Sequence, residues 1–354
     1  MILGAEDKLY ALEYELYSEV RDLIASQIER IQKTAKAVAA LDAFASLALV
    51  AERNNYVRPK INEKGVIDIK EGRHPVVERM IPNEMFISND TYLDDKKHRI
   101  SIITGPNMAG KSTYMRQVAL ITIMAQIGSF VPASSAHIGV ADRVFTRVGA
   151  SDDLASGQST FMVEMSEVAD ILNQATESSL IILDEIGRGT STYDGMSIAR
   201  AVVEYIANKR RIGARTLFAT HYHELTALEE LIEGVKNYNI AVKKRGDDIT
   251  FLRRIVRGGA DDSYGIEVAK LAGVPNPVIK RAKAVLKELE STMPQVEIHA
   301  IEEPDEEEDQ MSFGHMVATD IAARLRCLQM DVMTPIEALN ALYELKKLAE
   351  QERR

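Results

Sequence analysis

The residues between Gly105 and Ser112 combine glycine, lysine and serine at a spacing that suits phosphate chemistry. Their order is G-x-x-x-x-G-K-S, the pattern of a phosphate-binding loop, between an apolar run at 100–103 and a helical pattern. Glycines let successive backbone N–H groups face one anion, and the helix start adds its own unpaired N–H groups. The Lys111 ammonium would contact the β and γ phosphates, and the Ser112 hydroxyl would bind a magnesium ion. The alternative is an ordinary turn between a strand and a helix.

Two adjacent carboxylates follow a second apolar run, at 179–183. Asp184 and Glu185 would then lie at the carboxyl end of a buried strand, the edge at which α/β sheets bind ligands. Asp184 would hold the water shell of the magnesium ion, and Glu185 would orient or deprotonate the attacking water. The apolar run 215–220 ends in His221, which could contact the γ phosphate. A helix cap for the carboxylates and a structural role for the histidine are the alternatives.

Other groups could also contact a nucleotide. The polar loop 149–160 leads into a predicted helix at 161–176, and Ser159 could either bind an anion there or simply cap the helix. Phe86 and Ile87 could enclose a base or belong to the core. The residues of the loop predicted to bind nucleotide are Gly105, Pro106, Asn107, Met108, Ala109, Gly110, Lys111, Ser112 and Thr113.

Composition restricts the class of protein. With 354 residues the chain can form two or three domains, and its single cysteine, Cys327, excludes an intramolecular disulfide. No apolar run reads as long enough to cross a bilayer, and no secretory signal is expected. In the run 302–309 seven of eight residues are acidic, which accounts for most of the formal net charge of −10. The remainder is nearly neutral, so the charge neither supports nor excludes a DNA partner.

The flanking segments are predicted to be mainly helical. Residues 4–53 lack proline and show apolar residues at three- and four-residue steps, so we expect one long helix or a helical pair that packs its stripe on its own domain. A truncated helical arm is a further hypothesis. The segment 264–290 predicts two helices, used for packing rather than for reading DNA. An acidic, disordered linker should follow at 291–312, and two amphipathic helices within 313–354 should self-associate.

Four stretches, taken in order, carry a specific resemblance: GPNMAGKST, DDLASGQSTFMVEMSE, LDEIGRGTSTYDG and FATHYHEL. This set closely resembles the ATPase domain of the MutS family of mismatch-repair proteins, which are ABC-type ATPases. The likeness covers about 66–290 and includes KEGRHPVVE upstream of the loop. It implies an α/β fold in which an ABC-type P-loop NTPase sheet is flanked by helices.

The resemblance also implies a domain organisation and partners. Residues 1–58 would end the family's long lever helices, 59–290 would be the ATPase domain with a helix-turn-helix at 264–290, and 313–354 would be the oligomerisation segment. Two ATPase domains would form a head-to-tail homodimer, with higher oligomers through 313–354. DNA would bind through domains outside this chain, a MutL-type protein would be a partner, no membrane would be involved, and the protein would be cytoplasmic and bacterial.

Roles for individual residues follow from the same resemblance. Lys111, Ser112 and Asp184 would hold Mg-ATP, Glu185 would activate water, and His221 would sense the γ phosphate. These roles make ATP, ADP and Mg²⁺ the expected cofactors. The remaining contacts would come from Ser159, which would reach the nucleotide of the opposite subunit, and from Phe86 and Ile87, which match the family's adenine-contacting pair.

The sequence departs from the family pattern at a few positions. Ala109 replaces a usual glycine, Asn239 stands where many members have a histidine against the adenine, and Asp261 and Asp262 replace a serine-lysine pair. No phenylalanine is followed two residues later by glutamate, the pair with which the family reads mismatches. We therefore expect the ATPase and dimerisation part of a longer protein. The alternatives are a nucleotide-locked dimerisation module with little turnover, a MutS paralogue not dedicated to mismatch repair, and the ATPase subunit of an ABC transporter.

Overall fold

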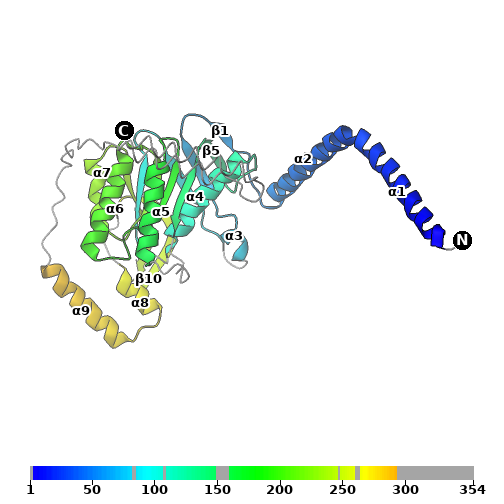
Figure 1. The fold of residues 1–354 in the computed structure, drawn as a ribbon. Coiled ribbons are helices and arrows are strands. Elements are labelled where there is room, and N and C mark those ends of the chain that lie inside the picture. The colour runs from blue at the N-terminus through cyan, green and yellow to red at the C-terminus, as the bar shows by residue number, and fades with distance from the viewer. Residues whose placement is uncertain are drawn as a thin grey trace, which may run out of the picture. The chain divides into compact units, whose positions relative to one another are not determined.

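The computed structural model describes residues 3–81, 85–106, 109–148, 159–245, 248–259 and 264–292. Its strands form two sheets, and helices cover them (Figure 1). The six-stranded sheet has the order β10-β9-β4-β8-β7-β6, and the four-stranded sheet has the order β1-β5-β2-β3. The predicted mixed α/β class is confirmed.

The six-stranded sheet places the chemistry-bearing strand ends next to one another. Strand β4 (Ile100–Thr104) pairs in parallel with β8 (Arg215–Ala219), which pairs in parallel with β7 (Leu180–Asp184). The three apolar runs that predicted these strands are buried, as parallel strands covered on both faces require. The carboxyl ends of all three strands therefore meet at one edge, as the sequence predicts. The sheet is completed by β6 (Val144–Val148), β9 (Val235–Arg245) and β10 (Asp248–Arg257).

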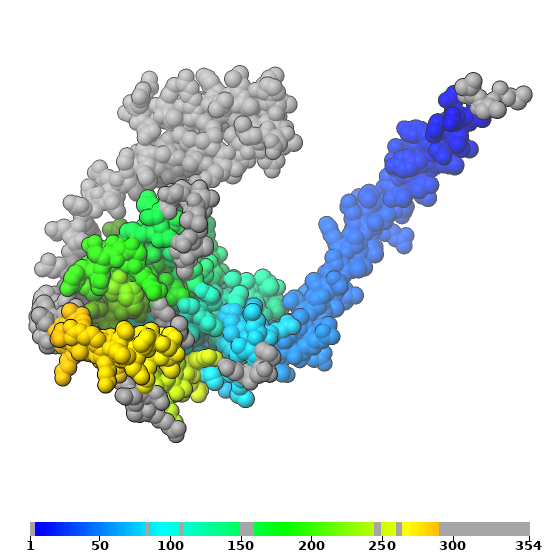
Figure 2. Space-filling view, turned by 90° about the horizontal axis from the view of Figure 1, so that it is seen from below, coloured from blue at the N-terminus to red at the C-terminus, as the bar shows by residue number. Residues whose placement is uncertain are grey.

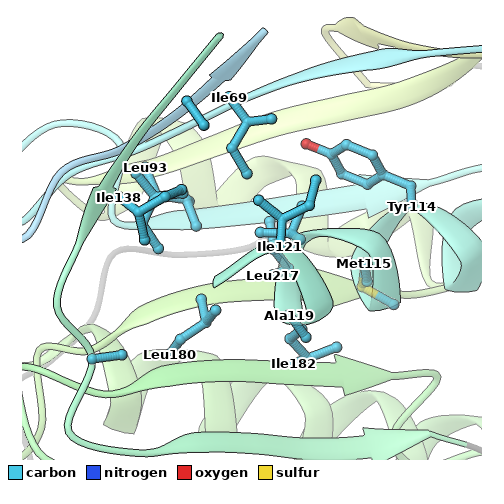
Figure 3. Packing of buried hydrophobic residues seen from close by; sticks show 14 of the residues in the cluster. Ile69, Leu93, Tyr114, Met115, Ala119, Ile121, Ile138, Leu180, Ile182 and Leu217 are labelled. Atoms are coloured by element: carbon cyan, nitrogen blue, oxygen red, sulfur yellow. The ribbon is translucent and has the colours of Figure 1, made fainter. Parts of the chain in front are cut away.

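Two hydrophobic clusters cover opposite faces of this sheet. On one face, α4 (Lys111–Gln126) packs between the six-stranded sheet and the four-stranded sheet, and Leu180 and Ile182 of β7 point into this cluster (Figure 3). On the other face, Ile181 and Leu183 contact α5 (Thr160–Gln174) and α6 (Thr192–Ala207). The alternation along β7 is the period of two expected for a strand. The smaller sheet consists of β1 (Lys60–Asn62), β2 (Ile67–Gly72), β3 (Asn89–Leu93) and β5 (Ser135–Gly139).

The N-terminal segment forms the predicted helical pair, α1 (Leu3–Ser26) and α2 (Ile28–Arg53), with a break at Gln27. The expectation that this segment packs its apolar stripe on its own domain is wrong. Both helices are drawn in blue in Figure 2. Large apolar side chains along them are exposed, and Ala51 is the one buried residue of α2. A helical period in the sequence predicts the helix but does not say which surface covers it.

Helix α2 bears on the expectation that no apolar run is long enough to cross a bilayer. By length and composition alone it could cross a membrane, with 6% of its most apolar window buried. This is weak support for a membrane segment, because core helices of soluble proteins meet the same criterion.

Several elements were predicted only in part. Strand β9 was not predicted. The expected pair at 264–290 is present as α8 (Gly265–Leu271) and α9 (Asn276–Thr292). Short helices occur at α3 (Val77–Met80), at α7 (Leu228–Leu231) and as a 3-10 turn at His223–Ala227. Residues 107–108, 149–158, 261–262 and 293–354 lie outside the described part of the chain, so the acidic linker and the C-terminal helices stay predictions.

Candidate functional site

The loop that begins at Gly105 is shaped by two glycines in the left-handed region. Gly105 has φ +120°, and Gly110, which precedes the first turn of α4, has φ +105°. These backbone conformations suit glycine, since a side chain would be strained there. The second glycine lets the chain enter α4 so that Lys111 becomes its first residue. The start of α4 therefore lies at the carboxyl end of β4, where helix N–H groups can face an anion.

Lys111 is buried at the centre of this edge, with 1% of its surface exposed. Its ammonium donates to the carbonyl oxygen of Gly105 and lies 3.5 Å from that of Thr220. It also lies 3.4 Å from Glu185 Oε1. Burial lowers the pKa of Lys111, and the Glu185 carboxylate opposes this shift. The loop after β4, the residue after β7 and the residue after β8 thus converge on one cation, and Thr220 is a contact that the sequence did not single out.

Asp184 has an environment that suits a cation ligand. Desolvation raises the pKa of its carboxyl, while a hydrogen bond with Ser112 acts in the opposite direction. Its Oδ1 atom is buried and has no hydrogen-bond partner within the described residues. A buried carboxylate oxygen without a partner is unfavourable unless a cation or water binds it. Among the described residues, no three or more histidine, cysteine, aspartate or glutamate side chains lie together so that they could hold a metal ion by themselves. A metal ion here would therefore be held by Ser112, Asp184 and a bound substrate.

Glu185 has an unusual backbone. Its φ of +57° lies in the left-handed region, which costs a residue other than glycine about 1–3 kcal/mol. Strained residues of this kind cluster at functional sites, although Asn55, Glu71 and Arg253 of this chain also have positive φ. The backbone N–H of Glu185 donates to the Ala219 carbonyl at 2.9 Å, so the residue is fixed to the end of β8. The side chain pairs with Arg188 at 2.9 Å as well as with Lys111. Arg188 is a charged neighbour that the sequence analysis missed.

His221 follows β8 at the same edge and is exposed. Its ring packs on Tyr222, with 4.0 Å between the ring centroids. Desolvation lowers the pKa of His221, and the Glu185 carboxylate opposes this shift. A lowered pKa keeps the imidazole neutral at pH 7, so one ring nitrogen can accept a hydrogen bond.

Ser159 caps helix α5. Its side chain accepts a hydrogen bond from the backbone N–H of Met162 at 3.2 Å, the ordinary N-cap contact. The capping alternative is therefore realised in the structure. Whether Ser159 also contacts the nucleotide of a second copy stays a prediction.

Phe86 and Ile87 lie in the segment before β3. Phe86 is half-buried and Ile87 is exposed. Asn89 anchors the segment, because its amide donates to Ile87 O at 3.4 Å and to Arg253 O at 3.0 Å, and its oxygen accepts from Ile255 N at 2.8 Å. These hydrogen bonds connect the segment to β10 and not to the site around Lys111. The contact of Phe86 and Ile87 with adenine therefore stays a prediction.

The side chain of Asn239, which departs from the family pattern, is used within the sheet. Its amide donates to the carbonyl oxygens of Gly258 and Gly259, at 3.0 and 2.9 Å. Asn239 belongs to β9, which pairs with β4 next to the loop. The asparagine therefore fixes the end of β10 against β9.

Comparisons with known proteins agree with this architecture. The family description "MutS domain V" matches residues 101–290, and "DNA mismatch repair protein MutS C-terminal region" matches residues 317–348. The chain is 72% identical over 288 residues to the DNA mismatch repair protein MutS of Lachnoclostridium phytofermentans, which covers 81% of this chain and 31% of that protein. It is 59% identical over 352 residues to the MutS of Acetivibrio thermocellus, covering 98% of this chain and 40% of that protein.

The chain thus spans less than half the length of these relatives. The match to domain V includes β4, α4, β7 and β8, which carry the convergent site, and it extends over more than half of the chain. The chain belongs to the MutS family of DNA mismatch repair proteins.

Proposed function

We propose that this chain binds and hydrolyses ATP and is the motor and dimerisation part of a MutS-type mismatch repair protein. The observation that carries the proposal is the convergence of Lys111 and Glu185 at one edge of the sheet, 3.4 Å apart, with the unpartnered Asp184 oxygen beside them. A buried lysine, a half-buried aspartate with a buried and unpartnered oxygen, and a carboxylate in a strained backbone are costly to stability. Such groups are typical of a site for phosphate, a divalent cation and water.

The proposed roles assign one task to each group. The loop 105–113 and the N-terminus of α4 bind the phosphates of ATP or ADP, and Lys111 neutralises the β and γ phosphates. Ser112 and Asp184 hold Mg²⁺, which would lower the energy of the developing phosphate charge. Glu185 accepts a proton from the attacking water. His221, in its neutral form, contacts the γ phosphate or that water.

The larger setting is proposed from the family. Residues 59–290 form an ABC-type ATPase domain that pairs with a second copy, so that Ser159 completes the site of its partner. Nucleotide binding and ADP release then change the state of a DNA clamp formed by domains outside this chain. A homodimer, a higher oligomer through 313–354, a MutL-type partner and a cytoplasmic location complete the proposal.

Two variants test the assignment in measurements of ATP binding and single-turnover hydrolysis. Lys111→Ala should abolish nucleotide binding, because the phosphate charge loses its buried cation. Glu185→Gln should bind ATP with nearly unchanged affinity and hydrolyse it at least about 100-fold more slowly, because the amide cannot accept the proton. Normal ATP affinity of the Lys111 variant would contradict the assigned loop.

The same experiment separates the rival functions. A nucleotide-locked dimerisation module would lose nothing measurable in Glu185→Gln, since it has little turnover to lose. A paralogue not dedicated to mismatch repair would hydrolyse ATP but would not restore repair when joined to the remaining domains of a relative. The ATPase subunit of a transporter is disfavoured by the family assignment.

A further inference from the structure

The turn after β7 contains two left-handed residues close together. Glu185 has φ +57° and Gly187 has φ +85°. The glycine adopts this conformation without strain, but the glutamate does not. A strained residue keeps its conformation only when contacts from outside the turn hold it there. The contacts that hold this turn therefore decide where the Glu185 carboxylate lies.

Both backbone groups of Gly187 are held by buried side chains from other elements. Its N–H donates to Glu164 Oε1 of α5 at 2.6 Å, and its carbonyl accepts from the Tyr222 hydroxyl at 3.0 Å. Glu164 is 6% exposed and Tyr222 is 4% exposed. Hydrogen bonds to a charged acceptor are about twice as strong as neutral ones, so the bond to Glu164 is the stronger of the two.

Close packing behind the turn prevents it from moving backwards. A Cβ atom added to Gly187 would lie 2.7 Å from the Cα atom of Gly195 in α6, and one added to Gly195 would collide with the Tyr222 hydroxyl. The two glycines therefore allow α6 to touch the turn directly. Helix α6 packs against one side of the turn, and Glu164 and Tyr222 bind the backbone groups of Gly187. The turn therefore has little conformational freedom.

The second oxygen of Glu164 is used differently. Glu164 Oε2 lies 3.6 Å from the guanidinium of Arg147 in β6, and the same guanidinium lies 2.9 Å from Glu167 Oε2. Arg147 is 4% exposed. Burying the Glu164 carboxylate would be costly without this cation. Arg147 thus compensates the charge, which leaves Oε1 available for the backbone of the turn.

We propose that Glu164 is a positioning residue for Glu185, and that it links the water-activating carboxylate to α5, the helix that Ser159 caps. It acts through the N–H of Gly187, two residues after Glu185. The inference rests on the proposed ATPase function, since it concerns the geometry of that reaction. A displacement of α5 would be transmitted through Glu164 to the turn, because the helix and the turn share this buried bond.

Two substitutions of Glu164 separate the effect of its side-chain length from the effect of its negative charge. Glu164→Asp keeps the charge near Arg147 but withdraws the carboxylate by one methylene from Gly187. Glu164→Gln keeps an acceptor oxygen at the same reach and loses the charge. For a positioning role, single-turnover hydrolysis at saturating ATP should fall about 10- to 100-fold in Glu164→Asp and stay within about 3-fold of wild type in Glu164→Gln. The affinity for ATP should change less than about 3-fold in both.

Glu167→Gln is the matched control. Glu167 lies on the same helix and pairs with the same arginine, but its side chain is 52% exposed, and its recorded contact is with Arg147. Its turnover should stay within about 2-fold of wild type. Hydrogen exchange provides a direct structural readout, because the amide of Gly187 should exchange faster in Glu164→Asp and not in Glu167→Gln.

The outcomes separate this inference from the proposed function. If wild type hydrolyses ATP, Lys111→Ala does not, and Glu164→Asp turns over at the wild-type rate, the positioning role is overturned and the ATPase function stands. A Glu164→Gln rate below that of Glu164→Asp would also overturn it, since charge and not reach would then matter. If Glu164→Asp fails to fold, Tyr222→Phe, which removes the other bond to Gly187, should lower turnover about 10-fold at unchanged ATP affinity. Wild-type turnover in Tyr222→Phe would count against the held turn. If wild type itself shows no hydrolysis, both proposals fail.

Discussion

Two cations are buried at opposite ends of the parallel strands, and their partners differ. Arg215, the first residue of β8, and Lys111, beyond the end of β4, are each 1% exposed. The Arg215 guanidinium donates to the carbonyl oxygens of Gly65, Gly139, Val140 and Ser178. Gly65 lies before β2, Gly139 and Val140 lie at and just after the end of β5, and Ser178 lies before β7. Arg215 thus joins the two sheets through neutral backbone groups.

Lys111 contacts carbonyl oxygens as well, those of Gly105 and Thr220, but unlike Arg215 it also contacts a carboxylate. Glu185 lies 3.4 Å from its ammonium, and Asp184 also acts on its pKa. Carbonyl dipoles can hold a cation without any additional ion. Adjacent carboxylates, in contrast, repel one another unless further positive charge is supplied. The comparison teaches that burial alone does not distinguish a structural cation from a functional one. The two are distinguished by whether carboxylates or only backbone carbonyls surround the cation.

The largest effect on stability should come from Arg215→Met. The substitution leaves up to four carbonyl oxygens without a donor, and each unsatisfied buried group costs about 1–3 kcal/mol. The free energy of unfolding in urea should fall by about 3–5 kcal/mol in total. Arg210→Met, an exposed arginine shortly before it, should change the same quantity by less than about 0.5 kcal/mol. Equal losses in the two variants would remove the structural role of Arg215.

Lys111→Met should show the reverse pattern. The methionine keeps an apolar stem in the buried position, and the protein no longer desolvates an ammonium. We expect the free energy of unfolding to change by less than about 1.5 kcal/mol. The affinity for ATP, measured by calorimetry, should fall at least about 100-fold, since the phosphates lose a buried charge partner. A large loss of stability with intact ATP affinity would reverse the comparison between the two cations.

Asp184→Asn tests the carboxylate side of the same edge. Because desolvation raises the pKa of Asp184 in the folded protein, the unfolded chain ionises first as the pH rises above 3.8. The wild-type protein therefore loses stability as pH rises through that window and does not regain it above. The variant lacks this loss and should be more stable than wild type at pH 7, while Mg²⁺-dependent ATP binding is lost.

Asp142→Asn is the control, because its effect on stability should have the opposite sign to that of Asp184→Asn. Desolvation acts to raise the pKa of Asp142, but hydrogen bonds from Thr176 and Ser179 outweigh it, and the pKa is lowered. The stability that it contributes is present above its unfolded pKa and is lost as pH falls through the folded value. The variant should be less stable at pH 7 by about 1 kcal/mol. If Asp184→Asn and Asp142→Asn were destabilised equally, the unpartnered Asp184 oxygen would not be a source of instability in the wild-type protein.

The strands of the site were predictable because their signal is local. Ile100 to Ile103 and Leu180 to Leu183 are apolar runs bounded by polar or glycine residues, and the loop between β4 and α4 has a defined spacing. Strand β9 was missed because a polar residue within it, Asn237, is satisfied by groups outside the strand, 8 and 11 residues upstream. Asn237 is buried, and its amide donates to Thr226 O at 2.6 Å while its N–H donates to Glu229. Such partners cannot be read from local pattern.

The same limit applies to the details of the site. The sequence identifies Glu185 as the residue after a strand aspartate, but not its left-handed backbone. Glu164 reads as one of several acidic residues on a helix, because its partner is a backbone N–H 23 residues away. The apolar stripe of α1 and α2 predicts helices correctly and their burial wrongly, since a stripe does not specify what covers it. Local spacing predicts elements, and contacts distant in sequence decide roles.

Ser159 is a single residue that could have a structural role, a functional role or both. Ser159→Ala removes the bond to Met162 N and should lower the free energy of unfolding by about 1 kcal/mol, whatever else the serine does. Ser159→Asp keeps a good N-cap and adds a negative charge. If Ser159 meets the phosphates of a second copy, the aspartate should keep stability within about 0.5 kcal/mol of wild type and lower turnover at least about 10-fold through repulsion.

Mixing subunits locates that effect. A subunit carrying Ser159→Asp and one carrying Lys111→Ala should together form one intact composite site, so partial turnover should return when the two inactive variants are combined. A cap without any contact across the dimer predicts instead that Ser159→Asp hydrolyses ATP at the wild-type rate alone. Absence of rescue at protein concentrations where dimers form, measured by sedimentation, would count against the shared site. Ser159 would then resemble Arg215, a residue whose partners lie entirely within its own chain.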